Sequence, residues 1–266
     1  MKCLTELKLR KKNKRNYRRA IIFLPMSIPF AVKKFVKRVL NWGSPEKYVR
    51  KLHEKQAYLD AYTAHTDARI AEGDAQRAIG GSWEEMGKLQ FDFLVKKGLK
   101  PHHTMLDIGC GTLRGGRHFI KYLDAGKYAG FDISAKAIEY GKQLAQKEGL
   151  ADKAPQLFVS EKKNLKFEEL KGKTFDFILA QSVLTHLPPE PIEECFENIG
   201  KVMDKNSVFY FTHFGGSRYQ HFSIEDFRYP FSHFQSLADE CGFSVKDCSS
   251  EYPHLIGQKM VEVKKK

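Results

Sequence analysis

Cysteine is scarce and unpaired in this chain of 266 residues. The five cysteines are an odd number, and no two of them form a Cys-x-x-Cys pair. A zinc ribbon or a dithiol redox site needs such a pair, and a small disulfide framework needs an even set. The composition excludes these classes and favours a reducing compartment, so we expect a cytoplasmic protein.

Long apolar runs are also missing. The longest apolar-rich stretch, 21–32, covers about 12 residues and contains Pro25 and Pro29, whereas a membrane-spanning helix needs about 20 apolar residues. Lys33 and Lys34 follow this stretch, in place of the small residues of a signal-peptide cleavage site. If the protein meets a membrane, we expect peripheral contact at the inner face.

Acidic residues are rare at the beginning of the chain. Residues 1–50 hold 15 Lys and Arg against two acids, Glu6 and Glu46, while the remaining residues are neutral overall, so this segment carries the whole net charge of +13. Residues 31–40 can form a helix with an apolar and a basic face. We predict a basic amphipathic extension, 1–42, whose residues 1–40 contact an anionic membrane surface. A nucleic-acid-binding arm is less favoured, because an apolar stretch interrupts the bases; a disordered or docked tail is the third interpretation.

Glycines gather in one informative place, residues 105–116 (MLDIGCGTLRGG). An apolar, strand-like run leads into bends at Gly109, Gly111 and Gly115 and then into a helical pattern. Glycine permits sharp bends and close approach of a ligand, and a helix N-terminus offers unpaired N–H groups. The dinucleotide pattern G-x-G-x-x-G would need a glycine at 114, where Arg114 stands, while an acid, Asp107, precedes the first glycine.

Two further segments follow in a fixed order. Residues 128–134 (YAGFDIS) predict a strand that ends at Asp132, with Ser134 as the N-cap of a helix over 135–148. Residues 175–187 (FDFILAQSVLTHL) predict a buried strand that runs into a polar turn. Together with D-x-G-x-G, these segments resemble motifs I, II and IV of the class I S-adenosylmethionine-dependent methyltransferases, over residues 80–265.

The resemblance implies the fold class: an α/β, doubly wound, mostly parallel seven-stranded sheet of the Rossmann-like methyltransferase type, here with a helical N-terminal extension. Together with the charge distribution and the helical pattern before residue 80, it predicts three regions: the extension 1–42, a helical linker 43–79 and a methyltransferase domain 80–266. Within these, we predict one helical stretch over 45–78, a helix capped by Ser223 and Asp226 that ends at Gly242, and last strands over 243–247 and 259–263. Trp83 and Met86 are candidates for a lid over the cofactor or for core residues.

The resemblance also implies the cofactor, S-adenosyl-L-methionine, and the residues that bind it. The loop after the first strand would hold its amino-acid part, Asp132 its ribose and Ile133 its adenine, while Gln181 and Ser182 would face the methyl group. Arg114 would contact a carboxylate or remain solvated, and the strand-three contact to adenine would be Glu161 or Asn164. The predicted cofactor-binding residues are Asp107, Gly109, Cys110, Gly111, Thr112, Arg114, Asp132, Ile133, Gln181 and Ser182.

Two histidines are candidate general bases. His186 follows the fourth predicted strand and His213 ends the next one. Imidazole titrates near neutral pH and can accept a hydroxyl proton. The alternative is that His186 packs structurally after its strand. No metal site is predicted.

Absent motifs narrow the acceptor. The chain has neither the Asn/Asp-Pro-Pro-Tyr/Phe motif of base-amino methyltransferases nor the Pro-Cys nucleophile of cytosine methylation. Residues 252–260 (YPHLIGQKM) and 80–86 (GGSWEEM) loosely resemble bacterial methyltransferases of cell-surface glycans or lipids. We therefore expect O-methylation of a small, glycan or lipid-linked acceptor. The alternatives are an RNA methyltransferase docked through the basic arm and a cofactor-binding protein without catalysis.

Overall fold

The computed structural model describes residues 45–266. The predicted extension, 1–42, lies outside them. The chain divides at Tyr48, and residues 49–266 form one compact unit. Among the described residues, no helix is long and apolar enough to cross a membrane.

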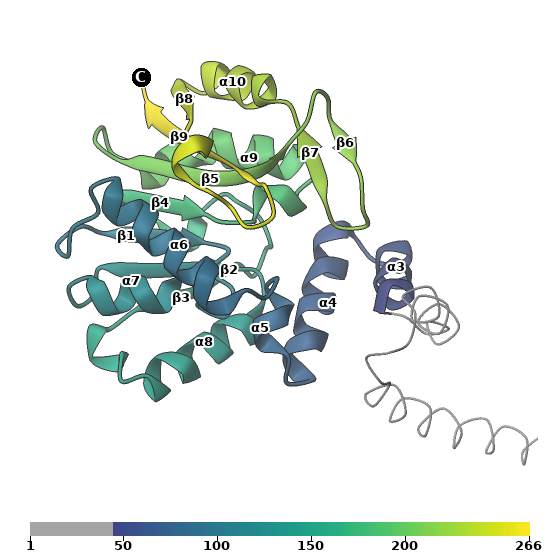
Figure 1. Ribbon diagram of the computed structural model, residues 1–266, viewed down its shortest axis with the longest axis horizontal. Coiled ribbons are helices and arrows are strands. Elements are labelled where there is room, and N and C mark those ends of the chain that lie inside the picture. The colour runs from purple at the N-terminus through teal and green to yellow at the C-terminus, as the bar shows by residue number, and fades with distance from the viewer. Residues whose placement is uncertain (1–44) are drawn as a thin grey trace, which may run out of the picture. The chain divides into compact units, whose positions relative to one another are not determined.

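Strands and helices alternate through the middle of the unit, as the sequence predicts (Figure 1). The strands are β1 (Met105–Ile108), β2 (Tyr128–Asp132), β3 (Gln156–Val159), β4 (Phe177–Ala180), β5 (Val208–Gly215), β6 (Gln220–His221), β7 (Phe227–Tyr229), β8 (Phe243–Asp247) and β9 (Lys259–Lys265). The helices are α3 (Pro45–Lys55), α4 (Tyr58–Ala71), α5 (Ala75–Ala78), α6 (Trp83–Lys96), α7 (Gly116–Tyr122), α8 (Ala135–Lys147), α9 (Pro189–Ile199) and α10 (Phe231–Glu240). Short 3-10 turns lie at η1 (Ala151–Lys153), η2 (Glu168–Leu170), η3 (Leu184–His186), η4 (Gly200–Val202) and η5 (Ser249–Glu251).

The strand order confirms the predicted fold class. The path runs β3-β2-β1-β4-β5, all parallel, and continues through β9, which is antiparallel to β5 and to β8. These seven strands form the predicted sheet, and the β6–β7 hairpin adds two short strands at the end of β5. The order reverses between β1 and β4, so a crevice opens there at the carboxyl ends of the strands.

Alternating side chains cover both faces of the sheet. Leu106 and Ile108 pack with buried residues of α9 and α10, whereas Met105 packs with those of α6, α7 and α8. This two-residue alternation along buried strands is what lets helices cover both faces. The core thereby fixes the carboxyl ends of β1, β2 and β4 side by side.

Two predicted elements differ in the structure. Residues 45–78 form three helices instead of one, separated at Gln56–Ala57 and at Glu72–Asp74. The predicted helix after Ser223 was wrong: Ser223 donates a hydrogen bond to Asp226 within a hairpin turn, and the helix begins only at Phe231. Phe227 and Tyr229 are buried while Arg228 is exposed, a period of two that favours a strand and outweighs the capping pattern.

Candidate cofactor and acceptor site

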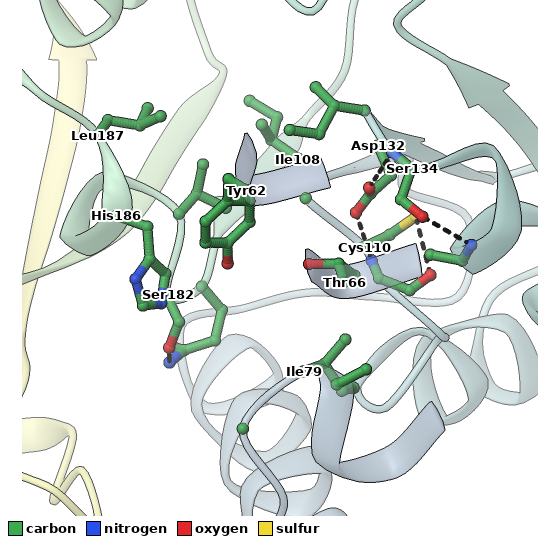
Figure 2. Close-up of a pocket in the computed structure, with 18 of the residues that line it drawn as sticks. Tyr62, Thr66, Ile79, Ile108, Cys110, Asp132, Ser134, Ser182, His186 and Leu187 are labelled. Carbon is green, nitrogen blue, oxygen red and sulfur yellow. Dashed lines mark hydrogen bonds between the residues drawn. The ribbon is translucent and has the colours of Figure 1, made fainter. Parts of the chain in front are cut away.

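A cavity of about 330 Å³ lies at the strand-order reversal, within the size range of small-molecule sites. Its floor is formed by the residues that follow β1, β2 and β4, and α4 contributes to the opposite wall, as Figure 2 shows for Tyr62 and Thr66. Of the predicted site residues, those that line the cavity are Asp107, Gly109, Cys110, Gly111, Arg114, Asp132, Ile133, Gln181, Ser182 and His186.

The loop after β1 bends at glycines with left-handed backbone. Gly109 has φ +66° and Gly111 has φ +54°. A Cβ atom on Gly109 would lie 2.3 Å from a methyl group of Val183, and one on Gly111 would lie 2.8 Å from Ile79. The glycines therefore let the loop pack against neighbouring segments on two sides of the cavity.

Asp132 is half-buried at the tip of β2 and faces the cavity (Figure 2). The Gly111 N–H donates to Asp132 Oδ2 at 2.9 Å, and the Ser134 N–H donates to Oδ1 at 2.7 Å. A carboxylate offers about four lone pairs, so two remain for a ligand. That capacity fits the two hydroxyls of a ribose.

Asp107 lies deeper, at 3% exposure. The Tyr128 hydroxyl donates to Asp107 Oδ2 at 2.8 Å. Burial raises the pKa of this carboxyl to about 7, against the opposing hydrogen bond from Tyr128. Asp107 thus titrates near neutral pH, and a cationic neighbour such as an amino group would stabilise its ionised form.

Arg114 is buried, not solvated. Its guanidinium donates to the carbonyl oxygens of Ile79 at 3.0 Å and of Gly81 at 2.7 Å. It therefore fixes the turn between α5 and α6 and still lines the cavity.

The segment after β4 is held in a strained conformation. Ser182 has φ +57°, which costs a non-glycine residue about 1 kcal/mol or more. Its N–H donates to the Thr212 hydroxyl at 2.8 Å, and its own hydroxyl donates to Gln258 at 3.0 Å. Neighbouring Gln181 accepts a hydrogen bond from the Tyr252 hydroxyl at 2.7 Å. Both predicted methyl-facing residues are thus fixed by the carboxyl-terminal part of the chain.

His186 lies beside Tyr62 at one end of the cavity, with ring centroids 5.4 Å apart (Figure 2). His186 Nδ1 is 2.7 Å from the carbonyl oxygen of Glu225 and 3.1 Å from a carboxylate oxygen of Asp226. Burial would raise the pKa of Asp226, but the hydrogen bonds from His186 and Ser223 hold it below its usual value. Because both partners of Nδ1 are acceptors, Nδ1 carries the proton, and Nε2 of the neutral ring is left as an acceptor.

Four predicted or candidate residues lie elsewhere. His213 does not line the cavity, so the structure does not place this second candidate base at the site. Its ring lies 4.7 Å from that of Phe234, and burial lowers the pKa of His213 to about 4. Thr112 is fully buried and bonds to the Ala75 carbonyl oxygen at 3.4 Å. Of the two lid candidates, Met86 lines the cavity, whereas Trp83 stacks under the Arg117 guanidinium. Of the two candidates for the adenine contact, Asn164 lines the cavity and Glu161 does not.

Sequence reasoning missed two groups of cavity residues. One belongs to the predicted linker: Tyr62, Thr66 and Arg69 of α4. The other belongs to the turn before β7, where Glu225 and Asp226 stand. An acidic pair beside aromatic residues was the available signal for the second group; the first carries no motif.

Glu225 joins these groups. It accepts hydrogen bonds from His53 of α3 and His65 of α4, each at 3.0 Å. Burial would raise the pKa of Glu225, but these two hydrogen bonds outweigh it and lower the pKa overall. The hairpin turn therefore ties down the α3–α4 segment through Glu225 and orients His186 through Asp226.

Comparison with known proteins agrees with this geometry. Residues 106–209 match the family model described as a methyltransferase domain. Over these residues the chain is similar to methyltransferase domains. A methyltransferase of the same fold is solved with the predicted cofactor, S-adenosylmethionine, bound to it.

Two curated relatives match part of the methyltransferase domain. A geranyl diphosphate 2-C-methyltransferase of Saccharopolyspora erythraea is 32% identical over 107 residues, 36% of this chain and 37% of that protein. A probable methyltransferase, ltbC, of Aspergillus luteorubrus is 31% identical over 98 residues, 34% and 32% of the two chains. The match spans about a third of the length of these relatives.

Solved structures share the fold over more of the chain. The magnesium protoporphyrin IX methyltransferase of Synechocystis, with S-adenosylmethionine bound, has a TM-score of 0.54 at 15% identity and covers 91% of this chain and all of that one. A Leishmania major S-adenosylmethionine-dependent methyltransferase has a TM-score of 0.58 at 14% identity and covers 79% of this chain and 83% of that one. At such identities the likeness concerns the fold of the domain.

Proposed function

We propose that this chain is an S-adenosylmethionine-dependent O-methyltransferase of a small, glycan or lipid-linked hydroxyl acceptor, with His186 as general base. One observation carries the proposal: His186 lines the cavity with Nδ1 bound to Asp226, which leaves Nε2 available to accept a proton. The name of the curated geranyl diphosphate relative, which refers to a small molecule, supports a small acceptor.

The cofactor-binding end of the site follows from the residues present. Asp132 would hold the ribose through its remaining lone pairs, and Asp107 the amino group of the methionyl part. Ile133 and Asn164 would contact the adenine. S-adenosylmethionine, when bound, supplies a methyl group on a positively charged sulfur.

The chain's own residues then act on the acceptor. His186 Nε2 would take the hydroxyl proton of the acceptor, whose oxygen would receive the methyl group. The sulfur would keep the electron pair of the broken carbon–sulfur bond. The ionised Asp226 stabilises the imidazolium that results and holds the ring in place. Tyr62 of α4 packs beside the His186 ring at this end of the cavity.

The test measures transfer of a labelled methyl group to a panel of phenols, alkyl glycosides and long-chain alcohols. We expect His186→Ala to slow transfer by about 100-fold or more, as general-base catalysis contributes about 10² to 10⁴, with affinity for S-adenosylhomocysteine unchanged. Asp226→Asn should slow transfer less, and His213→Ala serves as the matched histidine control. Equal rates in His186→Ala and the unaltered chain, or label found in RNA and in none of the panel, would contradict the proposal.

The basic segment 1–42 belongs to the same proposal. Its charge favours residence at an anionic membrane surface, where a lipid-linked acceptor would be concentrated.

A further inference from the structure

The turn between η5 and β9 inverts the usual distribution of polar and apolar side chains. Its polar residues His254 and Gln258 are buried, at 9% and 3% exposure. The aliphatic residues between them, Leu255 and Ile256, are exposed at 52% and 67%. Large aliphatic side chains normally lie inside and amides outside, so an inverted turn marks a surface that something apolar is meant to cover.

Hydrogen bonds hold the polar residues of this turn inside and so keep the aliphatic residues outside. Gln181 Nε2 donates to His254 Nε2 at 2.9 Å, and the Thr212 hydroxyl donates to Gln258 Oε1 at 2.7 Å. The Gly257 N–H donates to the His254 carbonyl oxygen at 3.0 Å, with Gly257 at φ +76°. Buried polar groups on both sides thus hold the two aliphatic residues in a fixed outward position.

Leu255 and Ile256 also line the cavity, although they are exposed. They therefore stand at its rim, where the cavity opens to solvent. Inside the rim the cavity is lined by further apolar residues from four other segments, namely Leu59, Val183, Leu187, Pro191 and Phe214. Val183 and Leu187, which flank His186 in the sequence, are thus among the apolar residues that line the cavity.

The same network connects the rim to the reacting end. Gln181 bonds to His254 and to Tyr252, and Ser182 bonds to Gln258. The turn that presents Leu255 and Ile256 thus also fixes the two residues predicted to face the methyl group. An acceptor that contacts the rim would therefore be held at a fixed position relative to Gln181 and Ser182.

We propose that the acceptor carries an apolar chain that leaves the cavity across Leu255 and Ile256, while its hydroxyl lies at His186. This inference rests on the proposed function and narrows its acceptor to amphiphilic hydroxyl compounds. The two aliphatic side chains select for chain length, since each methylene that they cover is removed from water.

The test measures binding of a series of 4-alkylphenols, from phenol to 4-hexylphenol, to the full chain saturated with S-adenosylhomocysteine. Calorimetry should show affinity rising about 2- to 4-fold per methylene, the upper value corresponding to a fully buried methylene. In the double variant Leu255→Ser, Ile256→Ser, this increase should largely disappear, while phenol itself binds as before. The matched control is Tyr219→Ser, which removes another exposed large apolar side chain, 46% exposed, that does not line the cavity.

Affinity that is independent of chain length in the unaltered chain, or an increase that the double variant retains, would overturn the inference. Both variants replace surface residues, and binding of S-adenosylhomocysteine verifies that they are folded. The labelled-methyl assay tests the proposed function separately, since absence of transfer to any hydroxyl acceptor would overturn methyl transfer itself. Transfer that proceeds only to short polar acceptors would overturn the apolar chain and leave methyl transfer intact.

Discussion

Gly109 is required both by the backbone conformation of the loop after β1 and by the packing around the site. Its backbone has φ +66°, and the space that a Cβ would need is taken by a Val183 methyl group at 2.3 Å. The residue after β1 therefore cannot carry a side chain unless the segment after β4 moves. That segment contains Ser182, so the glycine loop is packed directly against the segment that holds the residues predicted to face the methyl group.

Gly109→Ala should destabilise the fold beyond the backbone cost alone. Left-handed backbone costs an L-residue about 1–2 kcal/mol, and the contact with Val183 adds overpacking of about 1–3 kcal/mol. Gly126→Ala is the matched control, because Gly126 has φ +76° with nothing within 4 Å of its would-be Cβ. Thermal and urea unfolding should show a larger loss of unfolding free energy for Gly109→Ala than for Gly126→Ala. Adding Val183→Ala to Gly109→Ala should restore part of that stability. Equal losses of stability in the two glycine variants would refute the steric argument.

If Asp107 binds the cofactor as predicted, it should couple that binding to pH. Its pKa is raised to about 7 by burial, so at pH 6 most of this carboxyl is protonated before binding. A cationic amino group beside it favours the ionised form, so affinity for S-adenosylhomocysteine should rise as the pH rises toward 7, with proton release on binding.

Calorimetry at pH 6 in buffers of different ionisation enthalpy measures that release. We expect up to about one proton per site, and Asp107→Asn should remove most of the buffer dependence. Heats that are the same in every buffer would mean that Asp107 does not change its ionisation on binding.

At the scale of elements, α4 and the β6–β7 hairpin act together. Figure 1 shows the hairpin beside the end of α4, and Glu225 of the hairpin turn accepts hydrogen bonds from His65 of α4 and from His53 of the preceding helix α3. Further along α4, Asp67 accepts a hydrogen bond from the Ser134 hydroxyl at 2.5 Å, next to Asp132. The helix is thus fixed to both ends of the cavity, and this contact could not be predicted from a sequence that shows α4 only as a polar, alanine-rich stretch.

Glu225→Gln should loosen α4. Hydrogen bonds to a charged group contribute about 1.5–3 kcal/mol, and this carboxylate is only 16% exposed. Hydrogen exchange of residues 58–71 should become faster in the variant. Asp60→Asn is the control on the same helix: its pair with Lys163 is more exposed, with Asp60 at 53%, and should contribute less than about 1 kcal/mol.

The pH dependence should change as well. Since the pKa of Glu225 is below its usual value in the folded chain, its stabilising contribution is present above the ordinary glutamate pKa and is lost as the pH falls through the folded value. Glu225→Gln should therefore unfold with a flatter dependence on pH on the acidic side. An unchanged acid profile would show that the histidine contacts do not stabilise the fold.

At the scale of the whole molecule, charge and chemistry lie in different parts of the sequence. Residues 1–50 hold the net charge of +13, and the rest of the chain is neutral. A neutral enzyme with a basic appendage is suited to localisation by that appendage, since charge near an anionic surface attracts at about 1 kcal/mol per basic residue.

The full chain should therefore sediment with vesicles of phosphatidylcholine and phosphatidylglycerol at low salt, and should be released at roughly 0.5 M salt. A chain shortened to begin at Asn41 should stay in solution yet bind S-adenosylhomocysteine with equal affinity. Vesicles of phosphatidylcholine alone are the control. Binding of the shortened chain to anionic vesicles, or loss of its cofactor affinity, would contradict a membrane role for the extension.

The sequence by itself determined the seven strands of the main sheet, the glycine loop after β1 and the acid at the tip of β2. These features depend on neighbours along the chain: apolar alternation within a strand, a bend that needs glycine, and Ser134, whose hydroxyl accepts from the Ala137 N–H as predicted. Such features can be predicted from the sequence because the interacting groups lie within a few residues of one another.

Only the tertiary structure decided which histidine faces the cavity. His186 follows the buried strand β4, and η3 brings it to Asp226, 40 residues later in the chain. His213 lies within β5, where its ring packs against that of Phe234. The same holds for Glu225 with His53 and for Leu255 at the rim. Such groups meet through the packing of distant segments around the sheet, and no local pattern encodes that packing.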